Sequence, residues 1–166
     1  MSDSLELLKR SAAPRVASAR PLPPAGEDED EAACPSFGYL RGLRERADNI
    51  EFRREREGDS LSFPYSWLGP KRYHPSLGIV LLFVGSEMYL VTLRGRNLNR
   101  LSEAGISLYE RGILRHRVTW VREVQREESD ALPEEECVVE RIEVQAVPPE
   151  GAARAFGMEP VVSPGR

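Results

Sequence analysis

The stretch IVLLFV, residues 79–84, is a continuous run of apolar side chains near the middle of the chain. A run of this length and composition, bounded by turn signals, indicates a buried β-strand. The turn signals are PSLG at residues 75–78 and Gly85-Ser86 on the other side. The apolar residues 88–93 then predict a return strand. This strand pair is therefore expected to form the centre of the fold.

Upstream of this pair the sequence predicts a β-hairpin. Ile50 and Phe52 alternate with charged residues, and Leu61 and Phe63 alternate with serines, across a turn at residues 58–59. Pro64 must end the second strand or place it at an edge of the sheet, because proline cannot donate to a strand ladder. A shorter strand is expected over residues 67–73. Short connections favour antiparallel neighbours, so the five strands are predicted to form one meander.

Two segments have helical rather than strand spacing. Apolar residues recur through residues 97–114 in a pattern that predicts one interrupted helix or two short ones, followed by a final strand at residues 118–124. A short amphipathic helix is also expected over residues 35–47, with Phe37, Leu40 and Leu43 on one face. The predicted fold class is therefore α+β: a small antiparallel meander sheet of about five strands with a helical segment packed on it.

The predicted domain covers residues 36–125 and lies between segments of different composition. Residues 1–35 are acidic and proline-rich and are expected to be disordered, as are residues 148–166. Residues 126–147 are predicted to be an acidic linker with one extra strand around Val138 and Ile142. That strand could pair with an edge of the sheet or with a partner, and the pattern does not choose between them.

Charge is distributed unevenly in this chain of 166 residues, whose net charge is −4. Residues 41–122 carry 15 basic and 9 acidic side chains, a net charge of +6, between two acidic ends. No run approaches the roughly 18 apolar residues needed to cross a bilayer, and no secretory signal is visible. We expect a cytoplasmic protein whose two cysteines, Cys34 and Cys137, are free thiols, with a disulfide between them as the alternative.

No motif for catalysis or for a cofactor or metal is recognisable. His74 and His116 do not fit a zinc-ligand spacing, and Cys137 lies among glutamates, which raise rather than lower the pKa of a thiol. Nucleophile-elbow, phosphate-loop and dinucleotide-binding motifs are missing. The sequence therefore predicts neither a catalytic site nor a cofactor, although an enzyme of unrecognised type remains a third alternative.

Aromatic and basic residues mark the surface most suited to binding. The aromatic side chains concentrated between residues 63 and 83 are expected to be core and rim of a small sheet, or to form a stacking platform or partner hot spot. The candidate binding surface comprises Tyr65, Trp67, Tyr73, Arg94, Arg96 and Arg100.

Two resemblances accompany these residues. The strand that runs into Arg94-Gly95 resembles the second signature of Sm-like RNA-binding proteins, over about a dozen residues; this resemblance implies a helix before five bent strands and an RNA contact at that loop. The segments PYSWL (64–68), RGRNL (94–98), LYE (108–110) and HRV (116–118) together resemble short bacterial proteins of unknown activity. This second resemblance implies no activity.

The leading hypothesis is a non-catalytic binding or adaptor module with an unknown protein partner and no membrane association. The alternative is a nucleic-acid-binding domain that uses the basic centre, with six arginines as candidates: Arg94, Arg96, Arg100, Arg111, Arg115 and Arg117.

Overall fold

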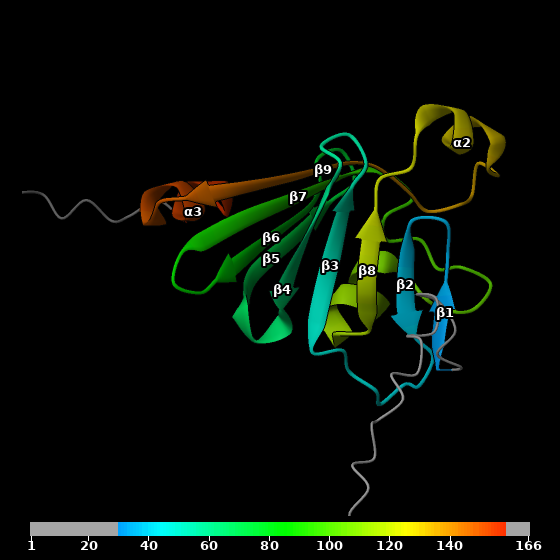
Figure 1. Ribbon diagram of the computed structural model, residues 1–166, viewed down its shortest axis with the longest axis horizontal. Helices are drawn as coiled ribbons and strands as arrows, with labels where there is room; N and C mark the ends of the chain where they lie inside the picture. The colour runs from blue at the N-terminus through cyan, green and yellow to red at the C-terminus, as the bar shows by residue number, and fades with distance from the viewer. Residues whose placement is uncertain (1–29, 159–166) are drawn as a thin grey trace, which may run out of the picture.

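The computed structural model describes residues 30–158 and is built from two β-sheets (Figure 1). The first sheet has the strand order β1-β2-β8-β3-β4, with bounds Glu31–Ala33, Phe37–Leu40, Val118–Arg122, Asn49–Arg54 and Asp59–Pro64. The second has the order β5-β6-β7-β9, with bounds Leu68–His74, Gly78–Val84, Met88–Arg96 and Val138–Val147. The second sheet is antiparallel, whereas the first is mixed because β3 and β8 run parallel.

Helical structure within residues 30–158 is confined to short segments. These are the 3₁₀ turn η1 (Tyr65–Trp67), the π-helical turn η2 (Leu108–Gly112), the 3₁₀ turn η3 (Ile113–Arg115), and the helices α2 (Arg126–Ala131) and α3 (Pro149–Ala155). Figure 1 shows α2 and α3 at opposite ends of the molecule. The chain is thus β-rich with few short helices.

The prediction of a single five-strand meander is wrong, although its hairpins are confirmed. β3 pairs with β4 in the expected register, with Ile50 opposite Phe63, and β5, β6 and β7 form a meander. The two units belong to different sheets because β4 ends at Pro64 and the chain turns a corner through η1. The Tyr65 N–H donates to Asp48 O (2.8 Å), which fixes this corner against the start of β3.

The core lies between the two sheets. Phe83 from β6 packs against Phe63 and Phe52 from the first sheet, with ring centroids 4.7 Å and 6.0 Å away. On the opposite face of β6, Val80 and Leu82 are also buried. Here α3 packs on β7 and β9. β6 is therefore buried on both faces, as its continuous apolar run indicates.

Both helix predictions need correction. Residues 37–40 of the expected first helix form β2, and Gly38 is needed there because a Cβ would lie 2.2 Å from Trp120 Nε1 on β8. Strand pairing therefore overrides a weak helical pattern. Between residues 97 and 116 only η2 and η3 are helical, and Gly112 cannot bear a Cβ, which would lie 2.7 Å from Ser107 O. The apolar residues of this segment still fill the core: Leu98, Ile106, Leu108 and Ile113 are all buried.

The segments predicted to be disordered contain secondary structure where the structure describes them. β1 lies inside the segment 1–35 and pairs with β2, and α3 lies inside the segment 148–166. Residues 1–29 and 159–166 lie outside the described residues. Residues 126–147 contain α2 and β9, and β9 pairs with β7 along its length as the outer strand of the second sheet. Of the two alternatives for this strand, pairing with the sheet or with a partner, the structure thus shows pairing with the sheet.

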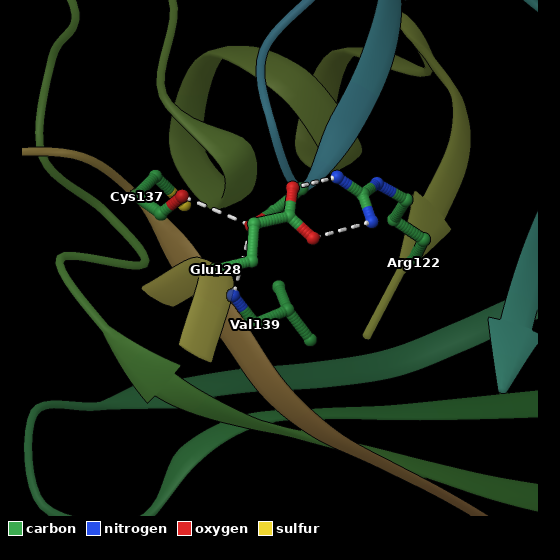
Figure 2. Close-up of polar contacts among 5 residues, drawn as sticks. Arg122, Glu128, Cys137 and Val139 are labelled. Atoms are coloured by element: carbon green, nitrogen blue, oxygen red, sulfur yellow. Dashed lines mark hydrogen bonds and ion pairs between the residues drawn. The ribbon is translucent and has the colours of Figure 1, made fainter. Parts of the chain in front are cut away.

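Two buried polar side chains link the first sheet to β9. Ser36 Oγ donates to Cys137 O (3.0 Å) and accepts from the Val139 N–H (3.0 Å), and its own carbonyl accepts from the Arg122 N–H (2.8 Å). Figure 2 shows Cys137 and Val139 at this point, together with the Arg122–Glu128 ion pair that joins β8 to α2. Further along, the Glu123 carboxylate accepts from the Ile142 N–H (2.8 Å) and the Arg56 N–H (3.0 Å).

Candidate binding site at the end of the second sheet

A surface depression of about 570 Å³ lies where β5 and β7 end. We call it the Tyr73 depression. Its lining residues are Tyr73, Pro75, Gly95, Arg96, Asn97, Leu98, Asn99 and Arg100. Three residues of the candidate binding surface, Tyr73, Arg96 and Arg100, are thus brought together by the fold. Among residues 30–158 no acidic side chain lines this depression.

Tyr73 is placed at the depression by the alternation of β5. It lies opposite the buried Ile79 of β6, so its side chain is on the core side of the sheet, where it is half-buried. Its ring packs against the ring of Tyr109 from η2, with centroids 5.7 Å apart and an interplanar angle of 33°. The ring is therefore held in a fixed position at low entropic cost.

The two arginines differ in how firmly they are held. Arg96 Nη2 donates to Ser129 O (2.9 Å), while Arg96 Nε is a buried donor without a hydrogen-bond partner among the described residues. The Arg100 side chain is exposed. A guanidinium with an unused buried donor and a second, exposed guanidinium beside it form an arrangement suited to an anion.

The loop that carries Arg100 is fixed by asparagine side chains. Asn97 adopts a positive φ of 55°, and its Nδ2 donates to Glu134 O (2.6 Å) and Glu136 O (3.0 Å). Asn99 Oδ1 accepts from the Glu110 N–H (3.0 Å). These side chains are therefore occupied in holding the loop, and Arg100 extends from a rigid support.

The other three residues of the candidate surface lie elsewhere. Tyr65 is buried, and its hydroxyl donates to Val118 O (2.7 Å). Trp67 lies at the opposite end of the second sheet, over Gly85, where a Cβ would approach its ring to 2.6 Å. Arg94 is exposed in β7 and stands opposite Arg141 in β9.

Gly95 has a packing role in this structure. A Cβ at Gly95 would lie 1.9 Å from Val138 O and 3.0 Å from Val139 Cα, so only glycine lets β9 approach β7 here. Packing alone thus accounts for the glycine of the Arg94-Gly95 pair.

A second depression, of about 550 Å³, lies across the loop 100–106 and is lined by both cysteines. Burial, reinforced by the charge of Glu136, raises the pKa of Cys34 to about 11. Burial is also the main reason why the pKa of Cys137 is raised, to about 12. Both groups are free thiols, and at neutral pH they are protonated and therefore weak nucleophiles.

His116 forms a further polar site that sequence reasoning missed. It ends η3 with a left-handed conformation (φ 55°), its ring stacks on Tyr65 at 4.5 Å, and its carbonyl accepts from the Ala47 N–H (2.7 Å). Burial lowers the pKa of His116, and the positive charges of Arg46 and Lys71 lower it further. Arg46, Lys71 and His116 come from three separate segments, so no local sequence pattern reveals the cluster.

The cations near His116 and at the Tyr73 depression form no ion pair within the described residues. Within residues 30–158 the ion pairs are Arg53–Glu51, Arg54–Asp59, Arg122–Glu128, Arg126–Asp130 and Arg141–Glu143. None of these pairs includes Arg46, Lys71, Arg96 or Arg100. In the same described part of the chain, no cluster of three or more His, Cys, Asp or Glu side chains could hold a metal ion.

No family model, curated protein or solved structure matches the chain. None of the helices between residues 30 and 158 has the length and apolar character required to span a bilayer.

Proposed function

We propose that the protein is a non-catalytic binding module whose Tyr73 depression takes an anionic ligand. The observation that carries this proposal is the lining: an aromatic ring and two arginines, Arg96 and Arg100, while none of the described acidic side chains lines the depression. Guanidinium groups bind carboxylates and phosphates through paired hydrogen bonds, and a fixed aromatic ring adds contact area at low entropic cost.

The chemistry of the surrounding groups supports recognition rather than catalysis. The thiols of Cys34 and Cys137 have raised pKa values and therefore make poor nucleophiles near neutral pH. The asparagines beside Arg100 bond to backbone groups of the protein itself, so they serve to hold the loop. A protein partner with acidic side chains and a phosphate-bearing partner would both satisfy the proposal.

A titration with inorganic tripolyphosphate, followed by two-dimensional NMR of the backbone amides, tests the proposal. We expect shifts concentrated in residues 95–100, and roughly tenfold weaker binding for Arg100→Gln, the loss that follows when one hydrogen bond to a charged group is removed. Arg94→Gln is the matched control, since Arg94 is an exposed arginine of the same strand region that does not line the depression. Shifts centred elsewhere, or equal losses in the two variants, would overturn the assignment of the site.

A further inference from the structure

The edge strand β5 connects the Tyr73 depression to the cations around His116. Lys71 and Tyr73 lie opposite Leu81 and Ile79, the core-facing residues of β6, so both side chains project from the same face of β5. Two residues along a strand correspond to a separation of about 7 Å. Lys71 also lies close enough to His116 for its charge to lower the pKa of that imidazole.

Rings and cations alternate along this edge. At one end His116 stacks on Tyr65, and its carbonyl accepts from the N–H of Ala47, the residue after Arg46 (2.7 Å); the charges of Arg46 and Lys71 both act on this imidazole. Tyr73, packed on Tyr109, follows, and Arg100 stands at the far end. We call the surface formed by Arg46, Lys71, Tyr73, Arg100, Tyr109 and His116 the β5 strip. The three rings are half-buried and held by their neighbours, and the two arginines are exposed.

We propose that a single-stranded nucleic acid binds along the β5 strip, with phosphates at Arg46, Lys71 and Arg100 and with bases against Tyr73 and His116. This inference rests on the proposed function, because the Tyr73 depression forms one end of the strip. Non-specific binders of single strands combine a basic track for the backbone with aromatic side chains on which bases stack.

The alternation of rings and cations favours a nucleic acid over an acidic peptide. Both ligands would use the cations, but only a nucleic acid supplies a flat ring for each protein ring. A single strand is required because the bases of a duplex are stacked on one another and cannot reach protein rings. The absence of ion pairs at these cations, among residues 30–158, leaves them available to phosphates.

The test is fluorescence anisotropy of a labelled oligothymidylate with the full-length chain at two salt concentrations. Three phosphate contacts predict a slope of log affinity against log salt of about −2, or roughly 20-fold weaker binding between about 50 and 200 mM salt. We expect Lys71→Gln to make this slope shallower by about 0.7. Arg72→Gln should leave it unchanged, because Arg72 lies opposite Val80 on the other face of the same strand.

Aromatic stacking is tested separately at Tyr73. Tyr73→Leu keeps an apolar side chain against Tyr109 but removes the ring, and should weaken oligothymidylate binding by roughly 5- to 150-fold. Tyr73→Phe should bind like the natural protein. A thermal melt of each variant shows whether the fold is retained, and the comparison of Leu with Phe at one position separates a lost ring from a general packing defect.

The outcomes distinguish this inference from the proposed function. If polyglutamate or tripolyphosphate binds in an Arg100-dependent way and oligothymidylate does not, the nucleic-acid inference is wrong and the proposed function stands. If Lys71→Gln and Arg72→Gln weaken oligothymidylate binding equally, the path along β5 is wrong. If oligothymidylate binding needs Lys71 and Tyr73 but not Arg100, the strip ends at Tyr73 and the phosphate contact at Arg100 is wrong. If tripolyphosphate binding is also independent of Arg100, the proposed function is wrong as well.

Discussion

Replacing Ser36 with alanine should destabilise the protein far more than the loss of a single hydroxyl group suggests. The Ser36 hydroxyl is fully buried and serves two backbone groups, the carbonyl of Cys137 and the N–H of Val139, each at 3.0 Å. Alanine would leave both groups buried without a partner. Each unsatisfied group costs about 1–3 kcal/mol, so we expect Ser36→Ala to lower the free energy of unfolding by about 2–4 kcal/mol after partial relaxation. This is a large share of a typical domain's stability.

Urea denaturation followed by tryptophan fluorescence measures this loss. With a typical denaturant dependence, the midpoint should fall by roughly 1–2 M urea without a change in slope. Ser62→Ala is the control, because Ser62 is exposed in β4 and should change stability by less than about 0.5 kcal/mol. Hydrogen exchange of the Val139 amide should also become faster in Ser36→Ala. Coincident midpoints for the two variants would refute the idea that Ser36 links the first sheet to β9.

Three further predictions concern packing, a buried carboxylate and pH. Gly95→Ala should lower stability by at least about 1–3 kcal/mol in thermal melts because backbone atoms of β9 block the Cβ, whereas Gly69→Ala, whose Cβ would be 3.5 Å from its neighbours, should have little effect. Glu123→Gln should cost about 1–3 kcal/mol in urea denaturation, since an amide cannot accept from both the Ile142 and Arg56 N–H groups through its two terminal atoms; an unchanged midpoint would contradict this. Folding lowers the pKa of His116 below 6.5, its value in the unfolded chain, so the neutral imidazole contributes to stability above pH 6.5 and this contribution is lost as the pH falls through the folded pKa. The melting temperature should therefore fall on acidification, and it should fall less steeply in His116→Gln.

The parts of the fold that sequence alone predicts correctly are those where one local pattern has one physical solution. The alternation around Ile50 and Phe52 with a turn at Gly58, which has a positive φ of 67°, produces the β3–β4 hairpin. The apolar run 79–84 produces β6, which is buried on both faces. In both segments burial and turn chemistry act within a few residues, so no distant contact is needed to choose the structure.

The sequence-based predictions fail where contacts between distant parts of the chain determine the local structure. Phe37, Leu40 and Leu43 fit a helical face, but Leu43 is 80% exposed while Phe37 is buried in β2. The division into two sheets depends on the corner after Pro64, which a strand count does not reveal. The helix α3 had a local signal that the composition obscured: Pro149 lies in its first turn, where proline is favoured, and alanines follow.

The candidate site was predictable only in part. Tyr73, Arg96 and Arg100 come together because β5 and β7 end at the same edge of the second sheet. Tyr65 and Trp67 do not join Tyr73, because the corner at η1 buries the ring of Tyr65 and places that of Trp67 at the opposite end of the sheet. Arg46, Lys71 and His116 come from three segments, and only the folded chain places them together.

The net charge of +6 in residues 41–122 is a poor guide to where an anion would bind, because the fold uses its arginines in different ways. Arg117 is buried, and its guanidinium donates to Leu40 O (2.9 Å) and Arg41 O (3.0 Å), so it cannot reach a ligand. Arg53 and Arg54 are ion-paired within the hairpin. Cations that are already bonded to carbonyls and carboxylates of the protein contribute little to the attraction of a new anion. The charge available to a ligand is therefore concentrated where arginine and lysine lack acidic partners within the described residues. The β5 strip is such a surface, and aromatic rings lie between its cations.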